Sequence, residues 1–453
     1  MLVLPFALGA QPAGNVAGTL PEDYLPQLRA IIATALKQSP TMMQQNINLS
    51  LAEAARYGAD SVLWPSVSGG ASYGFSNAHV SSDGITGPSS SSSGISYSVG
   101  LGQPIFAWGA LKASSDIAKL DQQIKQRQFA IAYRGLANSL RSQYLGLVAK
   151  KIGLRNSRAQ VKLLEVGMAN QEAMLKEGSV SSGDIILPRL ALDEARLNLE
   201  RAEIDLNYSR NIYRRLAGLD ELAEESIPDT LPPVTFTEAL ADSLLQSLVQ
   251  DGARNTLQAQ VDQMVVKQQD LNYKIAKTSL YPKFSLGAGY AISNAQSVSG
   301  NSVSQSFVTS YSYSFSGGWT IFDGFRTRGA KMTALANKRS DERQAQVDLE
   351  STLDNAQNMR RQLGVLAHAL NIAELRRALA QDGLKRTTEE LNEGTVSQST
   401  VDLATTSFAS ADYAAVSARM DYLNRWAEFV GLVGADPVLN ALPVSYLSSS
   451  HGK

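Results

Sequence analysis

The sequence consists of two similar halves, and this duplication limits the folds that the chain can adopt. Residues 63–65, Leu-Trp-Pro, recur 217 positions later at 280–282 as Leu-Tyr-Pro. Gly178 and Gly218 recur 216 positions later as Gly394 and Gly434. Repetition at a fixed offset indicates that one structural unit occurs twice in the fold.

Each half contains two stretches in which apolar and small residues alternate. Residues 67–76 read VSGGASYGFS, and similar patterns cover 95–102, 284–293 and 307–316. A period of two predicts a β-strand with one apolar, aromatic face and one face of serine and glycine. We therefore expect β-hairpins over 64–106 and 281–322, with Ser-rich loops over 77–94 and 294–305.

The remaining sequence predicts mainly helices. Two stretches without proline, 108–177 and 325–393, each predict a helix of roughly 100 Å, at about 1.5 Å per residue. The first repeat, 20–218, begins with a helix and ends with another over 183–217; the second, 236–434, begins with a helix and ends with one over 397–433. Residues 1–19 are expected to be a signal remnant or disordered, 219–235 a connector, and 435–453 a tail.

The first long helix carries two apolar stripes with seven-residue spacing. One runs from Ile117 through Asn138 to Val166, and the other from Tyr133 to Leu175. They lie two positions apart, about 200° around the helix, so each needs its own partner. We expect such helices to close into a ring; the alternative is a broad apolar face in a large bundle. Charged and amide residues, Lys125, Arg141, Lys162, Glu165, Gln122, Gln126 and Gln143, fill the other positions.

Composition argues against several classes of protein. The net charge is −1, which gives no reason to expect a nucleic-acid partner. There is no cysteine, and the three histidines lie far apart in sequence. We find no Ser-His-Asp set, metal-spaced cluster, phosphate loop or dinucleotide fingerprint. We therefore expect no enzyme activity, no cofactor and no metal site.

The alternating strands have the properties of a membrane-spanning sheet. About 9–11 residues per strand cross a bilayer, with one face toward lipid and the other toward the lumen. A spanning sheet must close on itself, because unpaired backbone groups in hydrocarbon cost several kcal/mol each. Four strands are too few for a barrel, so several copies would have to share one. The alternative is a soluble protein whose hairpins pack on its own helices.

Several motifs resemble one known family. Residues 103–106 (Gln-Pro-Ile-Phe) with Trp108-Gly109, residues 321–324 (Ile-Phe-Asp-Gly) and residues 401–406 (Val-Asp-Leu-Ala-Thr-Thr) look like those of the TolC-like outer-membrane efflux proteins. The resemblance covers about residues 20–440. It implies a mixed, mostly α fold with internal duplication, in which long antiparallel coiled-coil helices form an α-helical barrel. The four antiparallel strands would contribute to a trimeric twelve-stranded transmembrane β-barrel.

The resemblance also implies a location, partners and site residues. The homotrimer would lie in outer-membrane lipid with its helices in the periplasm, and 219–235 would form an equatorial belt with the C-terminal segment. A periplasmic adaptor attached to an inner-membrane pump would contact the tips, which are Glu177, Gly178, Ser179, Val180, Glu393, Gly394, Thr395 and Val396. Acidic residues would narrow the periplasmic mouth, and Asp184 and Asp402 are the candidates here. The family's paired aspartates fall nearest Thr400 and Leu403, which makes Thr400 a further gate candidate.

The expected function is an outer-membrane exit duct that passively conducts small molecules, such as drugs and toxic compounds. The same fold serving type I protein secretion is the first alternative. A soluble coiled-coil scaffold is the second.

Overall fold

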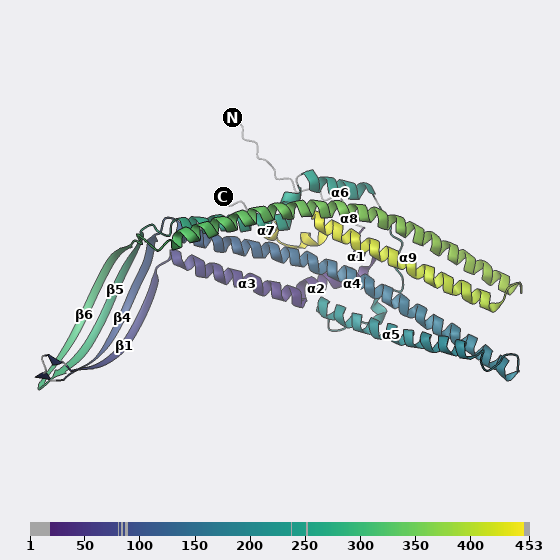
Figure 1. The fold of residues 1–453 in the computed structure, drawn as a ribbon, viewed down its shortest axis with the longest axis horizontal. Coiled ribbons are helices and arrows are strands. Elements are labelled where there is room, and N and C mark those ends of the chain that lie inside the picture. Colours follow the sequence, from purple (N-terminus) through teal and green to yellow (C-terminus); the bar gives the residue numbers. More distant parts are fainter. Residues whose placement is uncertain are drawn as a thin grey trace, which may run out of the picture. The chain divides into compact units, whose positions relative to one another are not determined.

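The computed structural model describes residues 19–79, 81–82, 85–86, 89–236, 238–250 and 252–447 (Figure 1). Contacts divide the chain into two units, and each half of the duplication contributes to both. The sheet unit lies within 48–125 and 261–345. The helical unit lies within 1–47, 126–260 and 346–453.

The sheet unit contains a four-stranded antiparallel sheet in the order β1-β4-β5-β6. Its strands are β1 (Ser66–Ala78), β4 (Ser90–Phe106), β5 (Lys283–Ser299) and β6 (Ser302–Gly318). Two short strands, β2 (Ser81–Ser82) and β3 (Ile85–Thr86), pair with each other between β1 and β4. The pair β4–β5 joins the first repeat to the second, and β1 and β6 have one neighbour each.

The strands extend further than the alternating pattern predicted. The prediction of a loop over 294–305 was wrong, because only Gly300 and Asn301 separate β5 from β6. The loop expected over 77–94 is also shorter, since β4 begins at Ser90. The run of consecutive serines over 89–93 carries no apolar period of two, and the mainly polar residues over 294–305 carry only two valines, so the pattern misses both stretches. Cross-strand contacts continue there, for example between the Ser76 and Ser92 hydroxyls, which are 2.7 Å apart.

The strand register places the four apolar patterns on one face of the sheet. Tyr97 of β4 pairs with Ala71 of β1 on one side and with Ile292 of β5 on the other. The preceding residue of β4, Ser96, pairs with Ser293 of β5. Directly opposed residues of neighbouring strands lie on the same face. The sheet therefore has an apolar, aromatic face and a face of serine and glycine.

The helices are α1 (Pro21–Tyr24), α2 (Pro26–Gln38), α3 (Pro40–Asp60), α4 (Ala110–Lys176), α5 (Ile186–Ala217), α6 (Glu238–Gln250), α7 (Leu257–Lys277), α8 (Arg326–Asn392) and α9 (Gln398–Val433). The helix expected to open the first repeat is divided before Pro26 and Pro40, because proline lacks the amide hydrogen that a helix interior needs. None of the helices described here is both long and apolar enough to cross a bilayer.

Each long helix begins directly after two residues with left-handed backbone. These are Trp108 and Gly109, with φ of +55° and +83°, and Gly324 and Phe325, with φ of +65° and +68°. Glycine tolerates this region, whereas a residue with a side chain adopts it at a cost. The strand-to-helix turn is therefore built in the same way in both halves, with an aromatic residue in a strained position.

Both stripes of α4 are largely buried within the chain. In the second stripe, Val161 and Met168 pack against Leu192 and Ala195 of α5. In the first stripe, Leu145 and Ile152 are also buried. The prediction that α4 needs a partner on each side is confirmed.

The long helix α8 differs from α4 in this respect. Its stripe through Leu363 and Leu370 is buried. The other stripe, Val365, Ile372 and Leu379, is 68%, 52% and 72% exposed. The described part of the chain therefore supplies a partner for one side of α8 in this region and leaves the other side exposed.

Arg141, which the sequence placed among the charged positions between the stripes, is fully buried. Its guanidinium donates hydrogen bonds to both carboxylate oxygens of Glu22 and of Asp436, and to Asn138 Oδ1 at 2.7 Å. Burial lowers the pKa of Arg141, but the hydrogen bonds to Asp436 and Glu22 outweigh it and raise that pKa above its ordinary value. The cluster joins α1, α4 and the segment after α9. The sequence signal was Asn138, a polar residue within an apolar stripe.

We expect Arg141→Met to destabilise the helical unit by about 3–5 kcal/mol, because it leaves two buried carboxylates without a counter-charge. Urea unfolding followed by circular dichroism in detergent measures this change. The matched control is Arg386→Met, since Arg386 is exposed and pairs with Asp382 one helical turn away; it should cost less than about 1 kcal/mol. Equal effects of the two substitutions would contradict a stabilising role for the cluster.

Candidate functional site

Two helical hairpins, α4–α5 and α8–α9, end in tips of the same geometry (Figure 1). Gly178 and Gly394 have φ of +73° and +76°. In each tip the glycine N–H donates to the carbonyl three residues earlier, and the next N–H to the carbonyl five residues earlier. This is the Schellman arrangement, which ends a helix at a left-handed residue. Sequence alone located both glycines.

The predicted tip residues present mostly exposed side chains. Glu177, Ser179, Glu393 and Thr395 are exposed, while the valines at 180 and 396 are half-buried. Beside each tip a serine begins the next turn, at Ser181 and Ser397. The tips thus offer polar groups to solvent around one anchored apolar residue each.

Asp184 and Thr400 occupy equivalent positions after the two tips and have similar local roles. The N–H and hydroxyl of Ser181 both donate to Asp184 Oδ2, at 2.8 and 2.7 Å. These hydrogen bonds favour the ionised carboxylate and lower the pKa of Asp184. The Thr400 hydroxyl lies 3.1 Å from the Ser397 hydroxyl. Each side chain therefore stabilises the turn that begins the returning helix.

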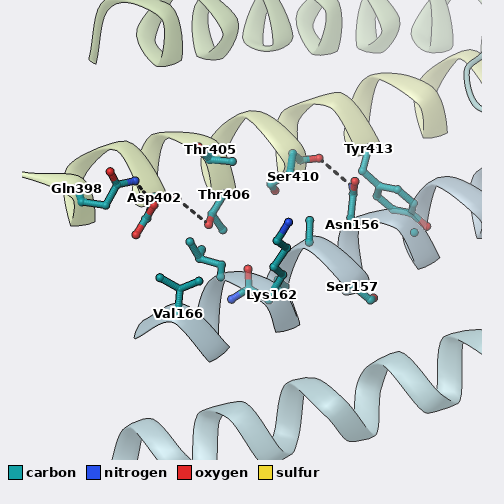
Figure 2. Close-up of a pocket in the computed structure, with 15 residues that line it drawn as sticks. Asn156, Ser157, Lys162, Val166, Gln398, Asp402, Thr405, Thr406, Ser410 and Tyr413 are labelled. Atoms are coloured by element: carbon teal, nitrogen blue, oxygen red, sulfur yellow. Dashed lines mark hydrogen bonds between the residues drawn. The ribbon is translucent and has the colours of Figure 1, made fainter. Parts of the chain in front are cut away.

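Asp402 lies further along, in the first turns of α9. It accepts a hydrogen bond of 2.9 Å from Gln398 Nε2, and its carbonyl accepts one from the Thr406 hydroxyl (Figure 2). Asp402 lines a groove between α4 and α9, and Asp184 does not. Within one chain, the structure does not join the two predicted mouth carboxylates in a single cluster.

The groove beside the second tip was not predicted from the sequence. It has a volume of about 660 Å³ and lies between residues 153–166 of α4 and residues 398–413 of α9. Lys162 extends from α4 into it (Figure 2), and Asn156 Nδ2 donates across it to the Ala409 carbonyl at 3.3 Å. The signal in the sequence was the stripe of α4, which ends in the small Ala159 and the exposed Val166.

The sheet offers a second candidate surface. Large side chains of its apolar face, such as Tyr73, Phe75 and Tyr313, are mostly exposed. Contiguous apolar surface of this kind marks contact with a membrane or a partner. Among the residues that the structure describes, no three His, Asp or Glu side chains are grouped as a metal site would require.

The comparisons with known proteins match this architecture. A family model described as "Outer membrane efflux protein" matches residues 31–219 and 248–435, one match in each repeat. A search of curated proteins finds no match.

Several solved structures share the fold. The outer membrane channel CmeC of Campylobacter jejuni superimposes with a TM-score of 0.72 at 14% identity, covering 99% of this chain and 98% of that one. The outer membrane protein VceC of Vibrio cholerae gives 0.64 at 14% identity, with coverage of 91% and 97%. The open state of the MtrE channel of Neisseria gonorrhoeae gives 0.62 at 14% identity, with coverage of 94% and 93%.

We expect Gly178→Ala and Gly394→Ala to destabilise their tips by about 1–2 kcal/mol, because alanine is strained at positive φ. Faster hydrogen exchange of the amides that follow each glycine would report the loss. Gly167→Ala is the matched control: Gly167 lies inside α4 with open space around it, so alanine should stabilise the helix by up to about 1 kcal/mol. Unchanged exchange at the tips would argue against the cap.

Proposed function

The chain belongs to the outer membrane efflux protein family, and we propose that three copies form the exit duct of a tripartite export system. In this proposal the sheets close into a barrel in the bacterial outer membrane, and the helices extend into the periplasm. Small toxic molecules pass through passively. An inner-membrane pump supplies the energy, and a periplasmic adaptor joins that pump to the duct.

One observation carries the proposal: the sheet has an exposed apolar face and two unpaired edges. The apolar face suits lipid, and the serine and glycine face suits a water-filled lumen. A sheet in lipid must close, because hydrocarbon offers no partners to edge N–H and C=O groups. Since β1 and β6 have one neighbour each, further copies of the chain are the natural source of the missing strands.

The helices support the same assembly. The stripe of Val365, Ile372 and Leu379 on α8 is exposed. A second exposed stripe on α5 consists of Leu190, Leu197 and Ile204. Apolar side chains at helical spacing that find no partner in their own chain favour packing against another chain. Burying these stripes between copies would continue a ring of helices below the barrel.

The tips fit the role of an adaptor contact. They are exposed, polar and held in shape by backbone hydrogen bonds at Gly178 and Gly394. A partner that recognises these turns could bias the hairpins between closed and open arrangements, without chemistry in this chain.

We expect Gly394→Val to reduce export while leaving the oligomer intact, because the β-branched side chain disturbs only the turn at one hairpin tip. Survival of a complemented deletion strain exposed to toxic compounds measures export, and the size of the purified protein in detergent measures assembly. Gly167→Ala should restore full survival. Normal survival with Gly394→Val would contradict adaptor contact at the tip, and a monomeric wild-type protein would contradict the duct itself.

A second prediction concerns the mouth. If Asp184 and Asp402 of all copies face the lumen, their charges attract cations. The double variant Asp184→Ala with Asp402→Ala should then lose cation preference, and block by multivalent cations, in planar-bilayer recordings. Asp382→Ala, which removes an exposed carboxylate of α8 paired with Arg386, is the control and should change neither. Unchanged cation selectivity in the double variant would contradict the prediction that Asp184 and Asp402 form an acidic mouth.

A further inference from the structure

The duplication supplies a template for a contact that one chain cannot make. The pairs β1–β4 and β5–β6 are the equivalent hairpins of the two repeats. The pair β4–β5 joins the end of one repeat to the beginning of the next, and the sheet contains one such junction. An equivalent junction would join β6 to the β1 strand of a second copy.

The equivalence of the repeats extends to strand register. β5 matches β1 at an offset of 217, and β6 matches β4 at an offset of 216. Adding these offsets to the pair Tyr73–Ile95 gives Tyr290–Tyr311, which is the pair observed between β5 and β6. Contacts of one repeat can therefore be transferred to the other by the same arithmetic.

Applied to the β4–β5 junction, the offsets yield one specific register between copies. The pair Tyr97–Ile292 becomes Tyr313 with Phe75 of a second copy. Both belong to the apolar face, and the alternate positions bring serine and glycine together in the same way. A register displaced by one residue would bring opposite faces together along the whole strand.

The junction also includes aromatic contacts at the helix end of the strands. Trp108 Nε1–H donates to the Pro282 carbonyl at 2.8 Å. Its ring meets Tyr281 edge to face at 5.2 Å between centroids, and Phe106 at 5.0 Å. The contacts of Trp108 with Pro282 and Tyr281 join the first repeat to the second, whereas its contact with Phe106 lies within the first repeat.

Phe322 and Phe325 contact each other at 5.5 Å between ring centroids. Among the described residues, however, the equivalent rings at the two open edges have no ring contact from another repeat. Phe322 corresponds to Phe106, Trp64 to Tyr281, and the ring of Phe325 lies one position beyond the equivalent of Trp108. The junction rings Phe106, Trp108 and Tyr281 are 46%, 42% and 41% exposed. Their counterparts Phe322, Phe325 and Trp64 are 71%, 67% and 71% exposed.

The backbone conformation of Phe325 also supports a contact with a second copy. Its φ of +68° favours glycine, yet an aromatic residue stands there whose one ring neighbour in the described chain is the exposed Phe322. Trp108 also has positive φ, and its ring makes the junction contacts. A second copy would supply the equivalent contacts to Phe325.

We propose that copies of this chain join edge to edge in that register, with Ser312 of β6 opposite Ser76 of β1, and with Phe325 of one copy packed on Trp64 of the next. The inference rests on the oligomer of the proposed function. It adds the register and the aromatic contact, both of which that function leaves open.

The absence of cysteine from the sequence makes the register testable by disulfide formation. The double variant Ser76→Cys with Ser312→Cys should form disulfides between copies on mild oxidation, because opposed residues of paired strands lie within disulfide reach. Denaturing electrophoresis without reductant should then show covalent dimers and trimers. The template pair, Ser96→Cys with Ser293→Cys, should form its disulfide within one chain and stay at monomer mass.

Two displaced pairs serve as matched controls. Ser76→Cys with Ser310→Cys, and Ser76→Cys with Ser314→Cys, keep the cysteines on the same face but shift them by two residues. Diagonal positions are about 7–8 Å apart, too far for a disulfide, so both variants should remain monomers on the gel.

The outcomes separate the inference from the proposed function. Linking of a displaced pair, of all pairs equally, or of no pair in a protein that still purifies as an oligomer overturns the register and leaves the duct in place. A wild-type protein that is monomeric in detergent overturns both.

A double-mutant cycle tests the aromatic contact. Phe325→Ala keeps the strained backbone and removes the ring, and Trp64→Ala removes its proposed partner. Each should lower the temperature at which the oligomer dissociates in detergent, and the double variant should lower it by less than the sum, because the rings share one contact. Additive effects would overturn the contact, since the rings would then act independently.

Discussion

Backbone pairing is the constraint on which the rest of this structure depends. The sheet ends at β1 and β6, each with a row of N–H and C=O groups that no strand in the described part of the chain pairs. Water can satisfy such groups, but hydrocarbon cannot. The large exposed side chains of the apolar face, including Tyr313 and Phe75, suit hydrocarbon rather than water. Strands from further copies, as in the proposed duct, would meet these two demands together.

The two long helices differ in how much of their apolar surface is buried within the chain. They arose from one repeat, yet α4 buries both of its stripes within the chain over most of its length, while α8 leaves Val365, Ile372 and Leu379 exposed. A helix with two opposed stripes is stable only with neighbours on both sides. The first repeat is therefore the more complete one, and the second presents the surface on which assembly would continue.

Polar groups hold the middle of the helical unit rigidly, in contrast to its tips. Besides the Arg141 cluster, Tyr144 donates to the Ser226 carbonyl at 3.0 Å, and Lys151 to the Ile227 carbonyl at 2.6 Å. These contacts fasten the connector 219–235 to α4. The tips have exposed residues and cap hydrogen bonds instead, so local opening should cost the least free energy there. The proposed gate at the tips agrees with this lower free energy of local opening.

Local patterns in the sequence determined the type of each main element, the two faces of the four long strands, the duplication and the turn glycines Gly178 and Gly394. All of these depend on residues that are neighbours along the chain. Only the tertiary structure decided the strand register, the burial of Arg141 between Glu22 and Asp436, and the groove that Asp402 lines. Each of these features joins segments that are far apart in sequence. Whether a charged side chain such as Arg141 contacts water or a buried carboxylate depends on the segments that pack around it. The periodicity of the sequence does not encode that packing.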